Sequence, residues 1–119
     1  MLKFLSFGSG SSGNCYILFT GADCLMIDCG VGIRTLKKHF YNYGLQMSMI
    51  HHILITHDHA DHVKSVGSIS GDLQLPVYAT DGTLQGIRNN WCVRRKIGTK
   101  LTHTINKGEE IQLGEFKVV

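Results

Sequence analysis

The stretch ILITHDHADH, residues 53–62, decides the fold of this protein. Its first three residues are apolar and two of them are β-branched isoleucines, a composition that is typical of a buried strand. Polar residues follow directly, and open α/β sheets place their chemistry beyond the carboxyl ends of their strands. The sequence therefore predicts a buried strand that presents a polar site just past its last residue.

Four potential metal ligands, His57, His59, Asp61 and His62, fall within six residues of this stretch. Side chains two apart on an extended backbone point the same way, so His57 and His59 can converge on one ion. Asp61 and His62 come where a helix over residues 60–66 can begin, and they can bind a second ion. Three of the seven histidines gather here beside two aspartates, which disfavours the alternative of isolated, solvated loop histidines. Imidazole and carboxylate ligands suit Zn²⁺, our first choice, or Mn and Fe, better than Mg²⁺ or Ca²⁺.

The pattern His57-x-His59-x-Asp61-His62 resembles the signature of the metallo-β-lactamase fold superfamily. Residues 25–30, LMIDCG, resemble the earlier Asp-x-Gly element of that superfamily, and residues 7–15, FGSGSSGNC, resemble its bacterial YycJ (WalJ) branch, whose members are implicated as DNA exonucleases. The resemblance implies an α/β (α+β) fold, namely the N-terminal half of an αββα sandwich with a largely antiparallel or mixed sheet and helices. It also implies that Asp28 orients the histidine loop without binding a metal directly, and that Asp61 has a catalytic role.

Two segments outside this motif are candidates for contact with a phosphate. The Gly/Ser loop carries Ser11, Ser12 and Asn14, whose hydroxyls and backbone N–H groups can hold a phosphate; the alternative is a flexible hairpin. The other segment is the basic run of Arg94, Arg95 and Lys96, which can attract a nucleic-acid backbone or can simply be a solvated face. The net charge of +3 neither establishes nor excludes a polyanionic partner.

Length and composition limit the number of domains and the class of protein. A chain of 119 residues with 43% hydrophobic and 18% charged residues allows one small folded domain, which we place at residues 1–119. The four cysteines include no C-x-x-C pair and predict reduced, buried thiols in a cytosolic protein, although Cys29 can approach the metal site. The first apolar run breaks at Gly8, too early for a signal peptide, and no stretch is long enough to cross a membrane. We therefore expect a cytoplasmic protein.

The remaining pattern predicts the order of the elements. Three short apolar runs in succession predict an antiparallel meander, and a helix should end at Gly44. His51 and His52 are adjacent, so on a strand they point to opposite faces and cannot both join the histidine cluster; we leave both out of the site. The expected strands are residues 2–7, 15–20, 24–28, 75–79, 100–105, 110–113 and 116–119. The first two expected helices cover residues 33–43 and residues 60–69, and Gly71 closes the second of them. A third helix should start at Thr80 or Asp81, with Leu84, Ile87 and Trp91 on its apolar stripe.

The ligand count suggests a longer parent protein. Catalytic zinc sites generally use three protein ligands and a water, whereas the motif supplies two ligands per ion, and the superfamily draws the others from later segments. A complete parent would hold two metals that activate a hydroxide for attack on phosphorus or a carbonyl. Our first hypothesis is a phosphodiesterase or DNA exonuclease. The alternatives are a hydrolase of small lactams, lactones or thioesters, and a non-catalytic metal-binding or interaction fragment.

For the 119-residue chain itself we expect no activity, weak metal binding and a homodimer. Half of a sandwich leaves an apolar sheet face and a strand edge in water, and a second copy commonly covers such surfaces.

Overall fold

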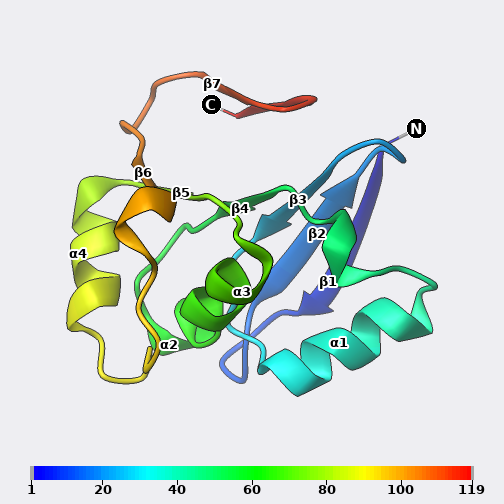
Figure 1. Ribbon diagram of the computed structural model, residues 1–119, viewed down its shortest axis with the longest axis horizontal. Helices are drawn as coiled ribbons and strands as arrows, with labels where there is room; N and C mark the ends of the chain where they lie inside the picture. Colours follow the sequence, from blue (N-terminus) through cyan, green and yellow to red (C-terminus); the bar gives the residue numbers. More distant parts are fainter. Residues whose placement is uncertain (1, 119) are drawn as a thin grey trace.

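A computed structural model describes residues 2–118 of the chain. The chain begins with three antiparallel strands, β1 (Lys3–Gly8), β2 (Cys15–Phe19) and β3 (Cys24–Ile27), which confirms the predicted meander. Three later strands add to β3 in parallel and give a mixed sheet in the order β1-β2-β3-β4-β5-β6 (Figure 1). These strands are β4 (His52–Leu54), β5 (Val77–Ala79) and β6 (Thr102–Thr104).

Helices cover one face of this sheet (Figure 1). Alternate residues of the strands point to this face, where Ile17, Met26, Ile53 and Val77 are fully buried in the main hydrophobic core. The helical elements are α1 (Ile33–Asn42), α2 (Ala60–Val63), α3 (Val66–Leu73) and α4 (Asp81–Asn89), with short 3-10 turns η1 (Met47–Met49) and η2 (Thr99–Leu101).

A separate hairpin, β7 (Ile111–Leu113) and β8 (Phe116–Val118), lies over part of the other face. Leu113 and Phe116 of the hairpin pack with Leu25 of the sheet in a second, smaller core. Val119, which we expected to end the last strand, lies outside the described residues. A mixed sheet with helices on one face and a strand pair on the other confirms the predicted α/β fold class.

Helix α1 has the predicted position because its apolar residues recur at helical spacing. Leu36 and Phe40 are buried, whereas Lys37 and Lys38 between them are exposed. Gly44 follows the helix with a positive φ of 70°, a conformation that glycine adopts without a steric penalty.

The continuous helix predicted over residues 60–69 is wrong, because the chain breaks at Ser65 between α2 and α3. The buried Ser65 hydroxyl lies 3.0 Å from the Cys29 carbonyl oxygen and 2.6 Å from that of Val31, and the Ser65 N–H also donates to Cys29. These hydrogen bonds replace those of a continuing helix. The predicted stop at Gly71 is also wrong: α3 continues to Leu73 and ends where Gln74 adopts a positive φ of 54°.

Two smaller predictions about the second half of the chain differ from the structure. Thr80 does cap α4, since its hydroxyl accepts the Thr83 N–H, but α4 ends at Asn89 and Trp91 is 83% exposed instead of lying on the apolar stripe. The strand predicted over residues 100–105 opens with the turn η2. Within residues 2–118, no helix combines the length and apolar character that crossing a membrane requires.

Candidate metal centre

Asp28 lies directly after β3 and is the buried centre of the candidate site. One carboxylate oxygen accepts the Thr56 N–H at 2.8 Å, and the other accepts the Thr56 hydroxyl at 2.6 Å and Nδ1 of His62 at 2.8 Å. The parallel pairing of Ile27 with Leu54 brings the two strand ends together and makes these contacts possible. Asp28 therefore connects the end of β3 to the histidine loop that follows β4.

His57 and His62 are the two histidines that the structure brings closest together. Their ring centroids are 4.5 Å apart, and Asp28, His57 and His62 offer ligand atoms that all lie within 4.8 Å of one another. His59 stands further out, with its ring 6.3 Å from that of His57 and 77% of its side chain exposed. A carboxylate oxygen of Asp61 lies 3.9 Å from Nε2 of His62. All the residues of the motif thus lie around one strand-end loop.

Hydrogen bonds fix which imidazole nitrogens face outward. The Thr56 hydroxyl donates to Asp28, so at 2.8 Å it accepts from Nδ1 of His57. Nδ1 of His62 donates to Asp28. Each ring therefore holds its hydrogen on Nδ1 and presents the lone pair of Nε2, which is the arrangement that metal-binding histidines use.

The Gly/Ser loop supports this site from the side. The Asn14 N–H donates to the Asp61 carbonyl oxygen at 2.7 Å, and its side-chain amide donates to the same oxygen at 3.1 Å. Asn14 is buried and also exchanges two hydrogen bonds with Gly10, so its amide holds the loop together. Ser11 and Ser12 are exposed on the same loop, where a ligand can reach their hydroxyls.

The basic run is partly engaged in structural contacts. Arg95 forms an ion pair with Asp72 at 2.5 Å, and the Lys96 ammonium donates to carbonyl oxygens near the end of α4, including that of Asn90 at 2.7 Å. Arg94 is exposed. Of the three cations, Arg94 is therefore the one best placed to meet a solvent-borne anion.

Cys29 is a buried structural residue, whereas the sequence also allowed it to approach the metal site. Its side chain is fully buried, and Sγ lies 3.2 Å from Sδ of Met26. Burial, with the nearby Cys15 and Asp28 adding to it, raises the pKa of the Cys29 thiol well above its usual range. A thiol that stays protonated is a poor metal ligand.

Two contributors to the site were missed at the sequence level. Thr56 bridges Asp28 and His57, and Asn90 donates its side-chain amide to the Asp58 carbonyl oxygen at 3.0 Å, which holds the histidine loop against the end of α4. The position of Thr56 just past the end of β4, beside an aspartate that follows the neighbouring strand, could have identified it. Asn90 carries no comparable signal, because its partner lies 32 residues away.

Fold and motif together define the class of protein. The chain belongs to the beta-lactamase superfamily domain family, whose model matches residues 23–119, and this confirms the resemblance seen in the sequence. Exodeoxyribonuclease YycJ of Bacillus anthracis is 34% identical over 82 residues, which cover 69% of this chain and 31% of that protein. Exodeoxyribonuclease WalJ of Streptococcus pneumoniae is 27% identical over 116 residues, which cover 98% of this chain and 43% of that protein. The chain thus spans less than half the length of these relatives.

Solved structures show the same fold. A B3 metallo-beta-lactamase with an active-site glutamic acid superimposes with a TM-score of 0.74 at 19% identity, over 91% of this chain and 45% of that one. The metallo-beta-lactamase SMB-1 gives a TM-score of 0.74 at 18% identity, over 94% of this chain and 47% of that one.

Proposed function

We propose that the whole protein is a metal-dependent hydrolase of phosphodiester bonds, namely a DNA exonuclease, and that residues 1–119 form one structural unit of it. The observation that carries the proposal is the gathering of His57, His59, Asp61 and His62 around one strand-end loop, where Asp28 orients the imidazole of His62. Similarity to two exodeoxyribonucleases supports DNA as the substrate. A chromosomal substrate would place the protein in the cytoplasm.

The donor set fits divalent zinc, with manganese and iron as alternatives. His57 and His62 present Nε2, while His59 and Asp61 supply further nitrogen and oxygen ligands from the same loop. Asp28 is the orienting residue, because both of its oxygens already accept hydrogen bonds from Thr56 and His62. When bound, such metals lower the pKa of water and stabilise negative charge that develops on phosphate oxygens.

The residues of this chain then have separate tasks. Asp28 and Thr56 hold the two imidazoles in the tautomer that can bind a metal. Asn14 fixes the backbone of Asp61, the proposed catalytic carboxylate. Ser11 and Ser12 lie on the loop that Asn14 closes and are proposed to contact a substrate phosphate.

The first prediction tests the metal mechanism in the full-length protein. His59→Ala should lower the zinc content and reduce exonuclease activity on end-labelled DNA by more than about 100-fold, because even outer partners of a ligand contribute about 10–100-fold. His103→Ala is the matched control, since His103 is an exposed histidine on the edge strand β6. Full activity and metal content in the His59 variant would exclude this mechanism, and lactam or thioester turnover without DNA cleavage would favour a small-molecule hydrolase.

The second prediction separates phosphate contact from base contact. Arg94→Ala should reduce the slope of log affinity for single-stranded DNA against log salt concentration by about 0.7, the value for one lost phosphate contact.

Trp91, which is 83% exposed and follows the Asn90 that contacts the histidine loop, is proposed to stack on a base. Trp91→Ala should weaken binding by about 1–3 kcal/mol with the slope unchanged. Slopes and affinities equal to those of the unaltered protein would show that both residues are only solvated.

Finally, we propose that the 119-residue chain by itself is inactive, binds metal weakly at the histidine loop and forms a homodimer. The first two properties follow from the ligand count of the motif. The third follows from the apolar sheet face, and its test is described in the Discussion.

A further inference from the structure

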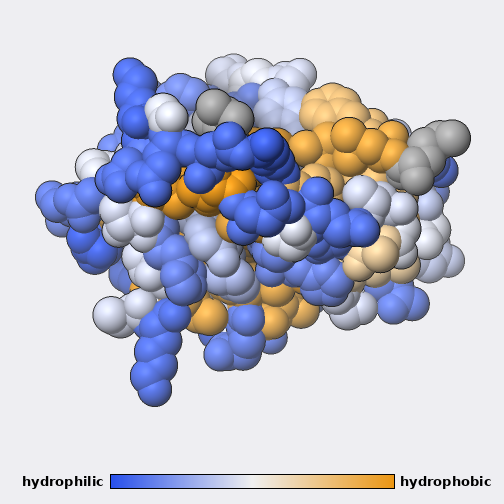
Figure 2. Space-filling view, turned by 90° about the horizontal axis from the view of Figure 1, so that it is seen from above, coloured by the Kyte–Doolittle hydropathy of each residue, from blue (hydrophilic) through white to orange (hydrophobic). Residues whose placement is uncertain are grey.

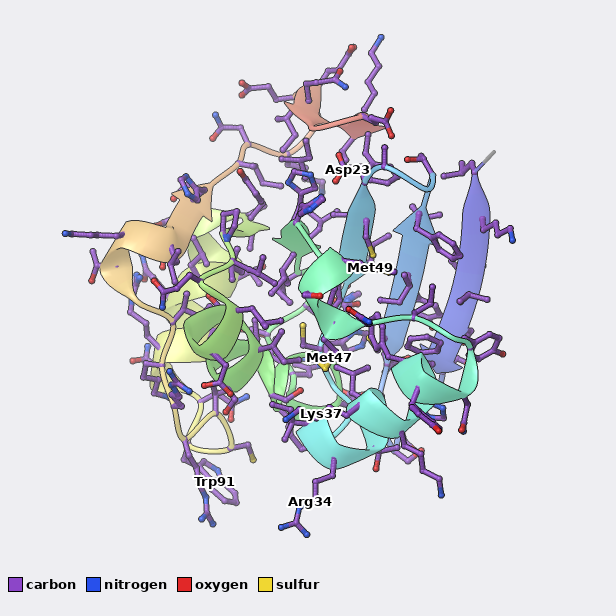
Figure 3. All side chains as sticks on the ribbon, turned by 45° about the vertical axis from the view of Figure 1, so that its right-hand side comes forward. Asp23, Arg34, Lys37, Met47, Met49 and Trp91 are labelled. Carbon is purple, nitrogen blue, oxygen red and sulfur yellow. The ribbon has the colours of Figure 1, made fainter. Side chains whose placement is uncertain are left out.

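A second group of metal-binding side chains lies at the opposite end of the same two strands. Asp23 directly precedes β3, His51 directly precedes β4, and His52 begins β4, whereas Asp28 and His57 follow the other ends of these strands. Asp28 comes five residues after Asp23 along the extended chain, which corresponds to about 16 Å. Figure 3 shows Asp23 beside the hairpin, at the end of the molecule away from Trp91.

The three side chains converge closely. Nδ1 of His51 and Nε2 of His52 lie 2.8 Å and 3.0 Å from the same oxygen of Asp23, and Nε2 of His52 lies 3.1 Å from the other oxygen. All the ligand atoms of this group lie within 4.8 Å of one another. The two adjacent histidines can meet because His51 lies before the strand begins and uses its near ring nitrogen, whereas His52 uses its far one.

The surrounding structure holds the carboxylate in place. The Cys24 N–H and the Glu115 N–H donate to its two oxygens, each at 2.9 Å. A Cβ at Gly114 would overlap an oxygen of Asp23, so glycine is needed where the hairpin crosses the group. An anionic, oriented carboxylate is what a metal ligand requires.

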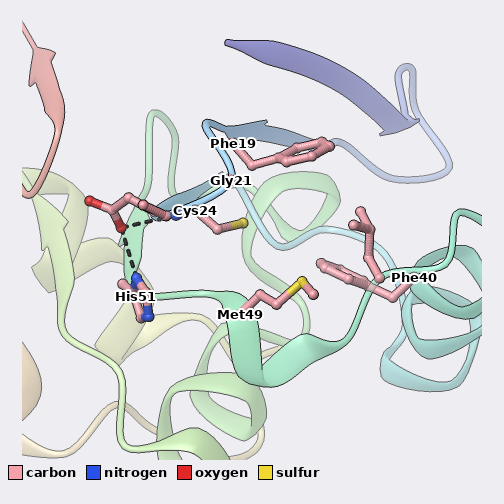
Figure 4. A pocket seen from close by; sticks show the side chains of 9 residues that line it. Phe19, Gly21, Cys24, Phe40, Met49 and His51 are labelled. Atoms are coloured by element: carbon pink, nitrogen blue, oxygen red, sulfur yellow. Dashed lines mark hydrogen bonds and ion pairs between the residues drawn. The ribbon is translucent and has the colours of Figure 1, made fainter. Parts of the chain in front are cut away.

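The group is also accessible. The His51 side chain is 51% exposed, while those of His52 and Asp23 are 15% and 8% exposed. Asp23 and His51 line a pocket of about 200 Å³, which leaves room for a water ligand beside them (Figure 4). Ligand atoms bound tetrahedrally at 2.0–2.1 Å lie about 3.3 Å apart. Each histidine nitrogen therefore needs to move away from the Asp23 oxygen by only a few tenths of an ångström, and the two nitrogens already lie within 4.8 Å of each other.

We propose that Asp23, His51 and His52 form a second divalent-cation site, separate from the histidine loop, which takes Zn²⁺ or a similar transition-metal ion and fastens the β7–β8 hairpin to the main sheet. Two imidazoles and one carboxylate, with an open position for water, match the ligand preference of zinc. In binding, each imidazole moves its hydrogen to the other ring nitrogen and stays neutral.

The experiment uses the whole 119-residue chain with the first site disabled by His57→Ala and His59→Ala, two exposed positions. Equilibration with zinc, followed by metal analysis and calorimetry, should give one ion per chain. Adding His51→Ala should weaken its binding by more than about tenfold, because loss of an outer partner alone costs that much. Adding His103→Ala should change nothing. Equal zinc binding with and without His51→Ala, or no zinc bound in the background variant, would overturn the proposal and leave only a hydrogen-bonded clamp.

A second measurement needs no substitution. Substoichiometric Cu²⁺ should broaden the amide NMR signals of Gly114 and Glu115, which lie against Asp23. Broadening confined to Thr56 and Asn14, which surround the histidine loop, would show that only the first site binds metal. This readout distinguishes the two sites even if a variant fails to fold.

Discussion

At the scale of single residues, Asp28 shows how backbone and side chain combine to build the candidate site. Asp28 has a positive φ of 64°, which is unfavourable for a residue with a Cβ and costs on the order of 1 kcal/mol or more. The turn aims its carboxylate at Thr56 and His62, and the three hydrogen bonds formed there offset that cost. The strained residue is thus held by the loop that it orders.

The cysteines give the third prediction. Burial is the main cause that raises the pKa values of Cys15 and Cys24 to about 12, with negative charge nearby adding to it. Cys29 is also buried, whereas Cys92 is half-buried. Iodoacetamide at pH 8 should therefore modify Cys92 alone in the folded protein and all four cysteines in guanidinium, as measured by intact mass. Modification of Cys15 or Cys24 as fast as Cys92 would contradict the buried positions.

The raised pKa values of Cys15 and Cys24 also predict that the stability of the folded protein decreases at alkaline pH. Between pH 9 and pH 12 the folded protein keeps the protons of Cys15 and Cys24, while the unfolded chain, with thiol pKa values of 9.0, has released them. This contribution to stability is complete below pH 9 and is lost as the pH rises toward 12. Urea unfolding at pH 8 and pH 10 should show the decrease, and it should be smaller in a Cys15→Ala variant relative to that variant's own stability at pH 8.

At the scale of elements, the fourth prediction concerns the approach of α2 to the end of β3. Asp61 in α2 presents its carbonyl oxygen so close to Gly30 that a Cβ there would overlap it. Gly30→Ala should therefore push α2 away and lower the free energy of unfolding by about 1–3 kcal/mol, the usual cost of overpacking. Gly32→Ala is the matched control, because nothing lies within 4 Å of its Cβ position and its φ is −58°.

Thermal and urea unfolding of both variants would check this prediction. The control should be neutral or slightly stabilised, since alanine restricts the unfolded chain. Equal stability of the two variants would show that α2 can shift without cost.

The elements also show which parts of the structure the sequence could predict. Helix α1 and the strands β1 to β3 follow from residues that are close together in the chain, and the histidine motif places its own ligands within one loop. The break at Ser65 depends on carbonyl groups 34 and 36 residues away, and the pairing of His51 with Asp23 spans 28 residues. Periodicity cannot reveal contacts of this kind, because they depend on which strands become neighbours.

At the scale of the whole molecule, the two faces of the sheet differ. Helices cover one face completely enough to bury Ile17, Met26 and Ile53 fully, but the β7–β8 hairpin covers only part of the other. A groove of about 520 Å³ remains beside it, lined largely by apolar side chains, among them Leu2, Leu18 and Val118. Figure 2, seen from above, shows apolar surface next to hydrophilic surface on this side of the molecule. An apolar surface of this kind favours association.

The fifth prediction is that the isolated 119-residue chain forms a dimer through this apolar surface. The register places Phe4 of the edge strand β1 beside Leu18, which is next to Leu25, so one apolar row crosses the sheet toward the groove. Phe4 is 58% exposed at the open end of that row. Phe4→Lys should therefore convert the dimer to a monomer in light scattering at about 100 μM, because it would place a charge within an apolar contact of roughly 800 Å² per partner. Tyr41→Lys is the matched control, because Tyr41 is 82% exposed on α1 in the other layer. A monomeric unaltered chain, or equal loss of the dimer in both variants, would show that this surface is not the contact.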